Sequence, residues 1–286
     1  MIPRPFEMHS PSTVSEAISL LKSMDDSKVL AGGQSLVPLM KLRLVSPANI
    51  VDLGGIQGLS YIMEAKGHLL IGSMTTHNQV AASSVINKKC EILSETAGQI
   101  GDQQVRNRGT IGGTICHADP AGDMPAAVLA LDAELKVAGP RRMRVIKAKD
   151  FFEDMLTTSL RRDEILTEVM VPVLPPRSGG AYLKLGRGAS DLATVGVAAV
   201  ITLDKDGACK DARLALAGVG STPIRATRAE EVLKGKSLAD DLVAEAGEKA
   251  AEMSNPSSDI RGSAEYKREM VKVYVKRAIR QSLARV

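Results

Sequence analysis

Two short segments of the sequence place adjacent glycines beside hydroxyl residues. They are Ala31-Gly32-Gly33-Gln34-Ser35 and Thr110-Ile111-Gly112-Gly113-Thr114. Glycine adopts backbone conformations with φ > 0 and lets a ligand approach the main chain closely. Successive N–H groups of such a loop converge on an anion, and a neighbouring hydroxyl adds a donor. Two loops of this kind that face each other would suit the two charged groups of a diphosphate.

Neither segment is a known nucleotide-binding fingerprint. The sequence has no GxGxxG motif opening a βαβ unit and no GxxxxGK[ST] motif, which argues against a Rossmann domain and a P-loop kinase. A single Gly-Gly pair is also typical of an ordinary turn. The anion-binding interpretation therefore depends on both segments together and on the strand that leads into the first.

Alternating helix and strand patterns over residues 1–56 position the first segment. Thr13 and Glu16 form the pattern of a helix capping box, and a short apolar strand over 28–31 runs directly into Gly32. The other elements expected here are a helix over 36–44 and a strand over 49–53. This alternation predicts a small α/β lobe.

Residues 57–177 predict a mixed α+β lobe that ends at a proline-rich break. The second glycine segment lies within 109–125, and the glycines and prolines there predict an irregular loop. A hairpin over 59–72 and two helices over 80–86 and 92–100 are expected before this loop. Three strands are expected after it, over 134–137, 143–146 and 165–171.

Residues 178–286 predict a three-stranded antiparallel sheet followed by helices. The strands are expected over 181–185, 195–203 and 212–217, and the helices over 226–233, 238–253 and 265–283. Residues 260–286 carry eight basic and two acidic side chains, although the net charge of the whole chain is only +4. This basic segment is either a solvated helix face or a docking surface for an acidic partner.

The composition excludes several classes of function. Three distant cysteines and four histidines without ligand spacing predict no protein-held metal. Aromatic residues make up only 2% of the chain, and with no reading motif this argues against nucleic-acid binding. No apolar run approaches the length of a membrane span, and no secretory signal is present. Together with free thiols, these features predict a cytoplasmic protein.

An ordered set of motifs extends over the whole chain. The set comprises Leu30–Leu36 with Pro38, Thr110–Gly113, Asp119-Pro120, Asp123–Ala126, Met1–Pro3, Gly72–His77 and Ser263–Lys267. It resembles the FAD-binding medium subunit of molybdenum hydroxylases, a group that includes the medium subunit of aerobic carbon monoxide dehydrogenase and the flavin domain of xanthine dehydrogenase. The resemblance implies an α+β fold, the FAD-binding fold of the vanillyl-alcohol-oxidase/PCMH type. Its three lobes would be residues 1–56, 57–177 and 178–286.

The resemblance also implies which residues bind FAD. Backbone amides of the first segment would wrap the diphosphate, hydroxyl and glycine residues of the second would close on it, and Asp123 would accept a hydrogen bond from the ribose or flavin side. Lys184 would lie near the isoalloxazine, two apolar residues would contact the ligand, and Thr76 and His77 would lie close to the first segment. The full set is Leu30, Ala31, Gly32, Gly33, Gln34, Ser35, Leu36, Thr76, His77, Ile100, Thr110, Gly113, Thr114, Asp123, Leu166 and Lys184.

Several of these residues have a purely structural alternative. Asp123 could cap the helix that begins near it, and Lys184 on a strand could face solvent. His77 could be a helix-start residue without a ligand. Ile100 and Leu166 could be ordinary core residues.

Two positions depart from the family pattern. Relatives commonly have Asn where Thr114 stands, so one hydroxyl donor is kept and an amide is lost. Close relatives place an aromatic where Leu192 stands, next to the flavin ring. Leucine neither stacks nor donates a hydrogen bond, so the flavin potential, oxygen access or choice of acceptor would differ.

The implied function is electron transfer within a molybdenum hydroxylase complex. A large molybdopterin subunit would hydroxylate the substrate, and a small subunit with [2Fe–2S] clusters would pass electrons to the FAD of this chain, in a dimer of heterotrimers. The FAD would deliver them to a quinone, oxygen or NAD. No residue is assigned as catalytic, because the cofactor supplies the redox chemistry.

Two other functions stay open at this point. One is a self-sufficient FAD-dependent oxidoreductase with its own substrate pocket, and the other is a non-enzymatic nucleotide-binding subunit. The substrate, the electron acceptor and the stoichiometry of the assembly are not encoded in any motif of this chain.

Overall fold

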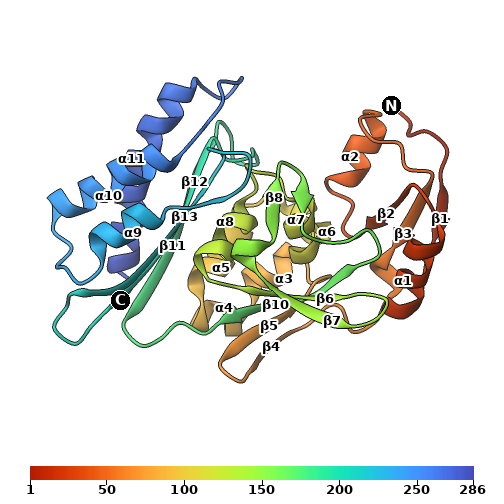
Figure 1. Cartoon of the computed structure of the whole chain (residues 1–286), viewed down its shortest axis with the longest axis horizontal. Helices are drawn as coiled ribbons and strands as arrows, with labels where there is room; N and C mark the ends of the chain where they lie inside the picture. Colours follow the sequence, from red (N-terminus) through yellow and green to blue (C-terminus); the bar gives the residue numbers. More distant parts are fainter.

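The computed structural model describes all residues, 1–286, and contains three main β-sheets along one axis of the molecule. Figure 1 shows the N-terminal part at the right, a central body, and the C-terminal sheet with its helices at the left. The fold is mixed α+β, as predicted. No helix is both long enough and apolar enough to cross a membrane.

The first sheet is parallel and has the order β1-β3-β2. Its strands are β1 (Glu7–His9), β2 (Ser27–Leu30) and β3 (Asn49–Asp52), joined by helices α1 (Val14–Ser23) and α2 (Leu36–Lys41), with the 3₁₀ turn η1 (Leu53–Gly55) after β3. Thr13 caps α1 by accepting from the Glu16 amide at 3.1 Å, as expected. The other half of the predicted capping box does not form, because the Glu16 carboxylate accepts from Ser12 instead.

The second sheet is antiparallel, with the order β4-β5-β10-β6-β7. Its strands are β4 (Ile62–Ala65), β5 (His68–Gly72), β6 (Glu134–Ala138), β7 (Met143–Lys147) and β10 (Ile165–Pro172). Helices α3 (His77–Ala82), α4 (Ser84–Lys89), α5 (Glu91–Gly98), α6 (Gln103–Arg108), α7 (Ile111–His117) and α8 (Asp123–Ala130) lie between β5 and β6. The turn η2 (Ala148–Asp150) and the small hairpin of β8 (Phe152–Asp154) and β9 (Thr157–Thr158) lie between β7 and β10.

Two expectations for this region are wrong. Residues 109–125 are not an irregular loop, because they contain α7 and the start of α8. Thr110 supplies the cap that starts α7, since its hydroxyl accepts from the Gly113 amide at 3.1 Å. The single helix expected over 80–86 is two helices, because Ser83 ends α3 and caps α4.

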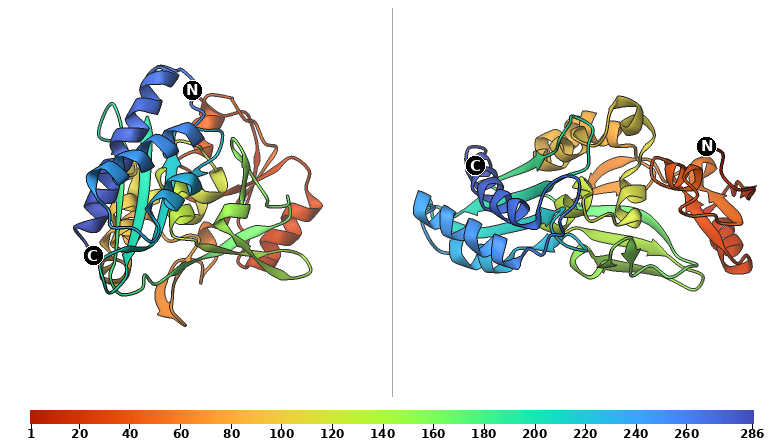
Figure 2. Two further views of the ribbon diagram at one scale, coloured as in Figure 1. Left: turned by 60° about the vertical axis from the view of Figure 1, so that its left-hand side comes forward. Right: turned by 90° about the horizontal axis from the view of Figure 1, so that it is seen from above.

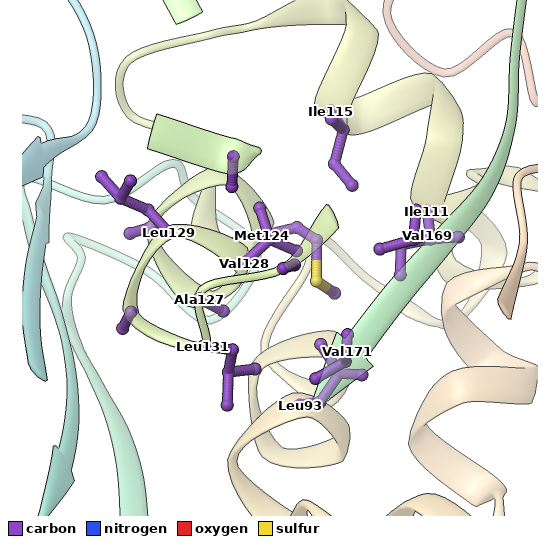
Figure 3. Close-up of a cluster of buried hydrophobic side chains, with 14 of the residues drawn as sticks. Leu93, Ile111, Ile115, Met124, Ala127, Val128, Leu129, Leu131, Val169 and Val171 are labelled. Carbon is purple, nitrogen blue, oxygen red and sulfur yellow. The ribbon is translucent and has the colours of Figure 1, made fainter. Parts of the chain in front are cut away.

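The main apolar core joins α7 and α8 to the second sheet. Figure 3 shows Ile111 and Ile115 of α7 and Met124 of α8 near Val169 of β10, within a cluster of fully buried side chains. This packing fixes α7 and α8 relative to the second sheet, and thereby the residues that precede them in the chain.

The third sheet is antiparallel and has four strands, one more than predicted. They are β11 (Ser178–Leu185), β12 (Val195–Leu203), β13 (Cys209–Ala217) and the short β14 (Ile224–Arg225). Helices α9 (Thr227–Leu233), α10 (Asp240–Met253) and α11 (Ala264–Leu283) pack on the sheet, while α5 and α8 also contact its strands (Figures 1 and 2). Covered in this way, β12 is buried at eight of its nine positions, which explains its continuous apolar run.

Three of the six basic residues of α11 have acidic partners within the chain. Lys272 pairs with Glu248 and Glu269, both at 2.9 Å, and Arg280 pairs with Asp240 at 2.8 Å. The other three have no acidic partner, so both interpretations of the basic segment stay open.

Candidate functional site

The two glycine segments lie against each other. A β-carbon on Gly32 would stand 2.1 Å from the carbonyl oxygen of Arg108, and one on Gly113 would stand 3.4 Å from the Ala31 β-carbon. Residues about 80 positions apart in the sequence are therefore in contact, where the β2–α2 connection packs against the α6–α7 junction. Only glycine at position 32 permits this approach.

The first segment presents a row of unused backbone donors. The N–H groups of six consecutive residues, from Ala31 to Leu36, have no acceptor anywhere in the chain. Gly33 has φ +75°, a left-handed conformation that turns the chain between β2 and α2. The residues are half-buried except for the exposed Gln34. Partly buried amides without partners are uncommon, and a loop that holds six in a row is suited to an anion.

The second segment differs from the first, because its amides have acceptors within the chain; a role for Thr110, Gly113 and Thr114 toward FAD stays a prediction. The amides of Ile111 and Gly112 donate to Thr75 O and Ser73 O at 2.9 and 2.8 Å. Those of Gly113 and Thr114 both donate to Thr110, at 3.1 Å each. The reason is that Gly112 and Gly113 belong to the first turn of α7.

Thr76 and His77 contact the second segment directly rather than the first. Thr76 forms a bridge with Thr110, and the His77 amide donates to Gly109 O at 2.9 Å. Thr76 also makes a complete capping box with Gln79 at the start of α3, and His77 is the first residue of that helix. His77 is thus a helix-start residue, as in the alternative without a ligand. A role for Thr76 or His77 toward FAD stays a prediction.

His77 is a buried and neutral imidazole. Its side chain is 2% exposed and Nδ1 has no hydrogen-bond partner. Burial, together with the nearby Arg106 cation, lowers its pKa to about 4. Arg106 itself donates to the carbonyl oxygens of Ile100 and Gly101 at 3.1 and 3.0 Å.

Asp123 and Lys184 meet in a buried ion pair. Lys184 Nζ lies 3.0 Å from Asp123 Oδ2 and donates to the Gln99 carbonyl at 2.6 Å, and the two side chains are 6% and 4% exposed. Tyr182 donates its hydroxyl to Asp123 Oδ1 at 2.6 Å. Burial raises the pKa of Asp123, and the Lys184 charge and the Tyr182 hydrogen bond act against this rise.

The geometry rules out the structural alternatives for this pair. Gly122, not Asp123, is the N-cap residue of α8, and Lys184 does not face solvent. An ammonium group has three hydrogens, and only two of those on Lys184 have acceptors in the chain. Tyr182 belongs to no motif in the sequence, but it lies two residues before Lys184 and so on the same face of the strand.

The remaining predicted residues differ in burial. Leu166 of β10 is 3% exposed within the main core, and Ile100 is half-buried against it. The Thr114 hydroxyl has no partner in the chain, and Leu192 is 40% exposed. No group of three or more histidine, cysteine or acidic residues lies close enough to hold a metal ion.

The donor set fits the cofactor that the resemblance implies. Unpaired amides at Ala31–Leu36 match the acceptor oxygens of a diphosphate, and Lys184 adds a buried cation with a free hydrogen. Thr114, which follows Gly113 at the contact with Ala31, adds a free hydroxyl. These are the groups expected of a site for a dinucleotide rather than for a metal.

Comparison with known proteins gives the same result over the whole chain. Residues 4–174 match the model of the FAD-binding domain in molybdopterin dehydrogenase, and residues 180–282 match the carbon monoxide dehydrogenase flavoprotein C-terminal domain. The carbon monoxide dehydrogenase medium chain of Hydrogenophaga pseudoflava is 38% identical over 286 residues, which cover 100% of this chain and 99% of the relative. The glyceraldehyde dehydrogenase medium chain of Sulfolobus acidocaldarius is 38% identical over 281 residues, 98% of this chain and 99% of the relative.

Solved structures agree with the sequence comparison. A chain of the carbon monoxide dehydrogenase from Hydrogenophaga pseudoflava superimposes with a TM-score of 0.97 at 40% identity, covering 99% of both chains. A chain of the quinoline 2-oxidoreductase from Pseudomonas putida 86 superimposes with a TM-score of 0.94 at 33% identity, again covering 99% of both. The chain therefore belongs to the family of FAD-binding flavoproteins of the molybdopterin dehydrogenases.

Proposed function

We propose that this chain is the FAD-carrying electron-transfer subunit of a molybdenum hydroxylase complex. It takes electrons from [2Fe–2S] clusters of a small partner subunit and passes them to an external acceptor, while a large molybdopterin subunit oxidises the substrate. The observation that carries the proposal is the row of six unpaired amides at Ala31–Leu36, in a chain whose family holds FAD.

The residues of this chain bind and orient the cofactor. Bound FAD supplies the acceptance and release of electrons. The amides of Ala31–Leu36 donate to its diphosphate, and the free hydroxyl of Thr114 adds a donor from the start of α7. Lys184 offers its third hydrogen near the isoalloxazine, where a cation stabilises negative charge. No side chain of the site is assigned as a general base.

The assembly, the location and the lobes are part of the same proposal. The large and small subunits and this chain form a heterotrimer, and two heterotrimers form a dimer. All three cysteines are free, which supports a cytoplasmic location. Lobes divided after residues 56 and 177 contain one main sheet each. The first boundary follows β3 and η1, and the second lies between β10 and β11.

Co-expression with the large and small subunits encoded by neighbouring genes tests the proposal. We expect a complex that contains stoichiometric FAD, molybdenum and iron, measured by flavin absorbance and metal analysis. Turnover of a substrate by this chain alone would instead favour a self-sufficient oxidoreductase. A complex that lacks flavin would favour a nucleotide-binding subunit without redox function.

A further inference from the structure

Tyr182 supports Asp123 from inside the protein. The tyrosine is fully buried, and its hydroxyl lies 2.6 Å from Asp123 Oδ1, while Lys184 holds Oδ2 at 3.0 Å. Because Tyr182 has no exposed surface, it has no access to a bound cofactor. Any influence of the Tyr182 hydroxyl on the site passes through the carboxylate of Asp123.

A glycine on the neighbouring strand β12 leaves the space that the Tyr182 hydroxyl occupies. Gly196 of β12 pairs with Lys184 of β11, and a β-carbon at Gly196 would stand 2.4 Å from the Tyr182 hydroxyl oxygen. The main chain of Tyr182 is fixed as well, since its amide donates to Glu95 at 2.9 Å and its carbonyl accepts from Gln99 at 3.0 Å. The ring therefore has one position, in which the hydroxyl reaches Asp123.

We propose that Tyr182, whose ring position is fixed by Gly196, is a positioning residue of the flavin site, which holds the Asp123 carboxylate against Lys184. Lys184 is then held in place by Asp123 and the Gln99 carbonyl, with one hydrogen free for FAD. This inference rests on the proposed function, because it takes Asp123 and Lys184 as residues that line the FAD site.

The electrostatics of the pair give the inference a pH signature. Three titratable groups face Asp123: Lys184 and Tyr182 from β11, and Asp119 from the turn before α8. Burial raises the pKa of Asp123, Lys184 and Tyr182 lower it, and Asp119 raises it. Removing the Tyr182 hydroxyl takes away one of the opposing effects, so Asp123 is protonated at a higher pH and Lys184 loses its counter-charge.

The test compares Tyr182→Phe with the unchanged protein in the assembled complex. FAD retained after dialysis over a series of decreasing pH values is measured by flavin absorbance relative to protein. We expect the midpoint of FAD loss to move upward by about one pH unit, the size expected for one hydrogen bond to a charged group. The control Tyr266→Phe removes the hydroxyl of a tyrosine that is 45% exposed, and its midpoint should not move.

Gly196→Ala provides a second and independent variant. Its methyl group would displace the Tyr182 hydroxyl, so the same upward shift is expected. In the double variant Gly196→Ala/Tyr182→Phe the hydroxyl is already absent, and no further shift should occur. Additive shifts would overturn the role of Gly196 in fixing the ring position.

Failure of the inference and failure of the proposed function are distinguishable. If the unchanged complex binds FAD, and Tyr182→Phe loses FAD with the same midpoint pH as the unchanged complex, the positioning role is overturned and the proposed function stands. If the unchanged complex contains no FAD, the proposed function fails and the inference fails with it.

Discussion

The Cα of Gly32 faces the carbonyl of Arg108 so closely that a β-carbon would lie 2.1 Å from its oxygen. At this contact, the loop with the unpaired amides packs against the backbone of the α6–α7 junction. No backbone hydrogen bond joins residues 1–56 to the remainder of the chain. Apolar packing of α1 against Ala138 and Ile165 holds this part of the chain, and the contact at Gly32 sets the position of the amides relative to the start of α7.

Gly32→Ala tests this contact. The methyl group would force the loop away from the α6–α7 junction, with overpacking that costs about 1–3 kcal/mol. We expect the dissociation constant of FAD from the assembled complex to rise about tenfold, the size of the effect of about 1.4 kcal/mol on binding. Flavin absorbance relative to protein over a series of FAD concentrations measures it.

Gly98→Ala is the matched control. Gly98 is the last residue of α5, and a β-carbon there meets nothing within 4 Å. This variant should bind FAD as tightly as the unchanged complex. Equally tight binding in Gly32→Ala would show that the close approach is not needed for binding.

The buried pair predicts a stability effect separate from cofactor binding. Lys184→Met leaves the Asp123 carboxylate buried without a counter-charge, so the free energy of unfolding should fall by about 3–5 kcal/mol. Adding Asp123→Leu should restore most of that stability, because no charge then remains buried. Denaturant unfolding measures the free energy, while FAD content should be low in both variants.

An exposed pair is the control for this measurement. Lys249 and Glu252 lie 2.9 Å apart with side chains 38% and 49% exposed, so Lys249→Met should change the free energy of unfolding by less than about 1 kcal/mol. Equal effects of Lys184→Met and Lys249→Met would mean that burial does not set the strength of the Asp123–Lys184 pair.

His77 predicts a pH dependence of stability in mild acid. The folded chain holds this group with a pKa of about 4, below the ordinary value of 6.5, so the unfolded chain takes up a proton first as the pH falls. Stability is therefore lost between pH 6.5 and 4, by about 3 kcal/mol in total. His77→Gln should remove this component from the pH profile of the free energy of unfolding.

His68→Gln serves as the control, since His68 is only half-buried at the start of β5. Its pH profile should follow that of the unchanged protein. A His77→Gln profile that is parallel to the unchanged one would contradict the buried, neutral state of His77.

Thr110 tests the assignment of the second glycine pair to a helix. Thr110→Ala removes the acceptor of the Gly113 amide and should lower the free energy of unfolding by about 1 kcal/mol. Thr110→Ser keeps the hydroxyl and should lose much less. Equal losses would mean that the methyl group, rather than the cap, stabilises α7.

The first glycine segment could be predicted from sequence because its geometry is local. A strand that ends in Gly32-Gly33 turns within a few residues, and its free amides follow from that turn. The second segment could not be predicted in the same way. Glycine disfavours a helix interior by only about 1 kcal/mol, and the cap from Thr110 together with the contacts to Ser73 and Thr75 outweighs this cost.

The pairing of Asp123 with Lys184 could not be predicted from the sequence either. Each was a candidate cofactor residue, but they are 61 positions apart, and their contact depends on how α8 packs on the third sheet. No local pattern encodes that packing. Tyr182 shares a strand face with Lys184, so its place near the site could have been found once the strand was assigned.

The most direct test of the central claim is the position of the diphosphate in an experimental structure of the FAD-loaded complex. We expect its oxygens within about 3.2 Å of amide nitrogens of Ala31–Leu36, a normal hydrogen-bond distance. The amide nitrogens of Ile111–Thr114 should make no such contact, because their hydrogens are already donated within the chain. A diphosphate bound away from Ala31–Leu36, or held by the amides at the start of α7, would contradict the assignment.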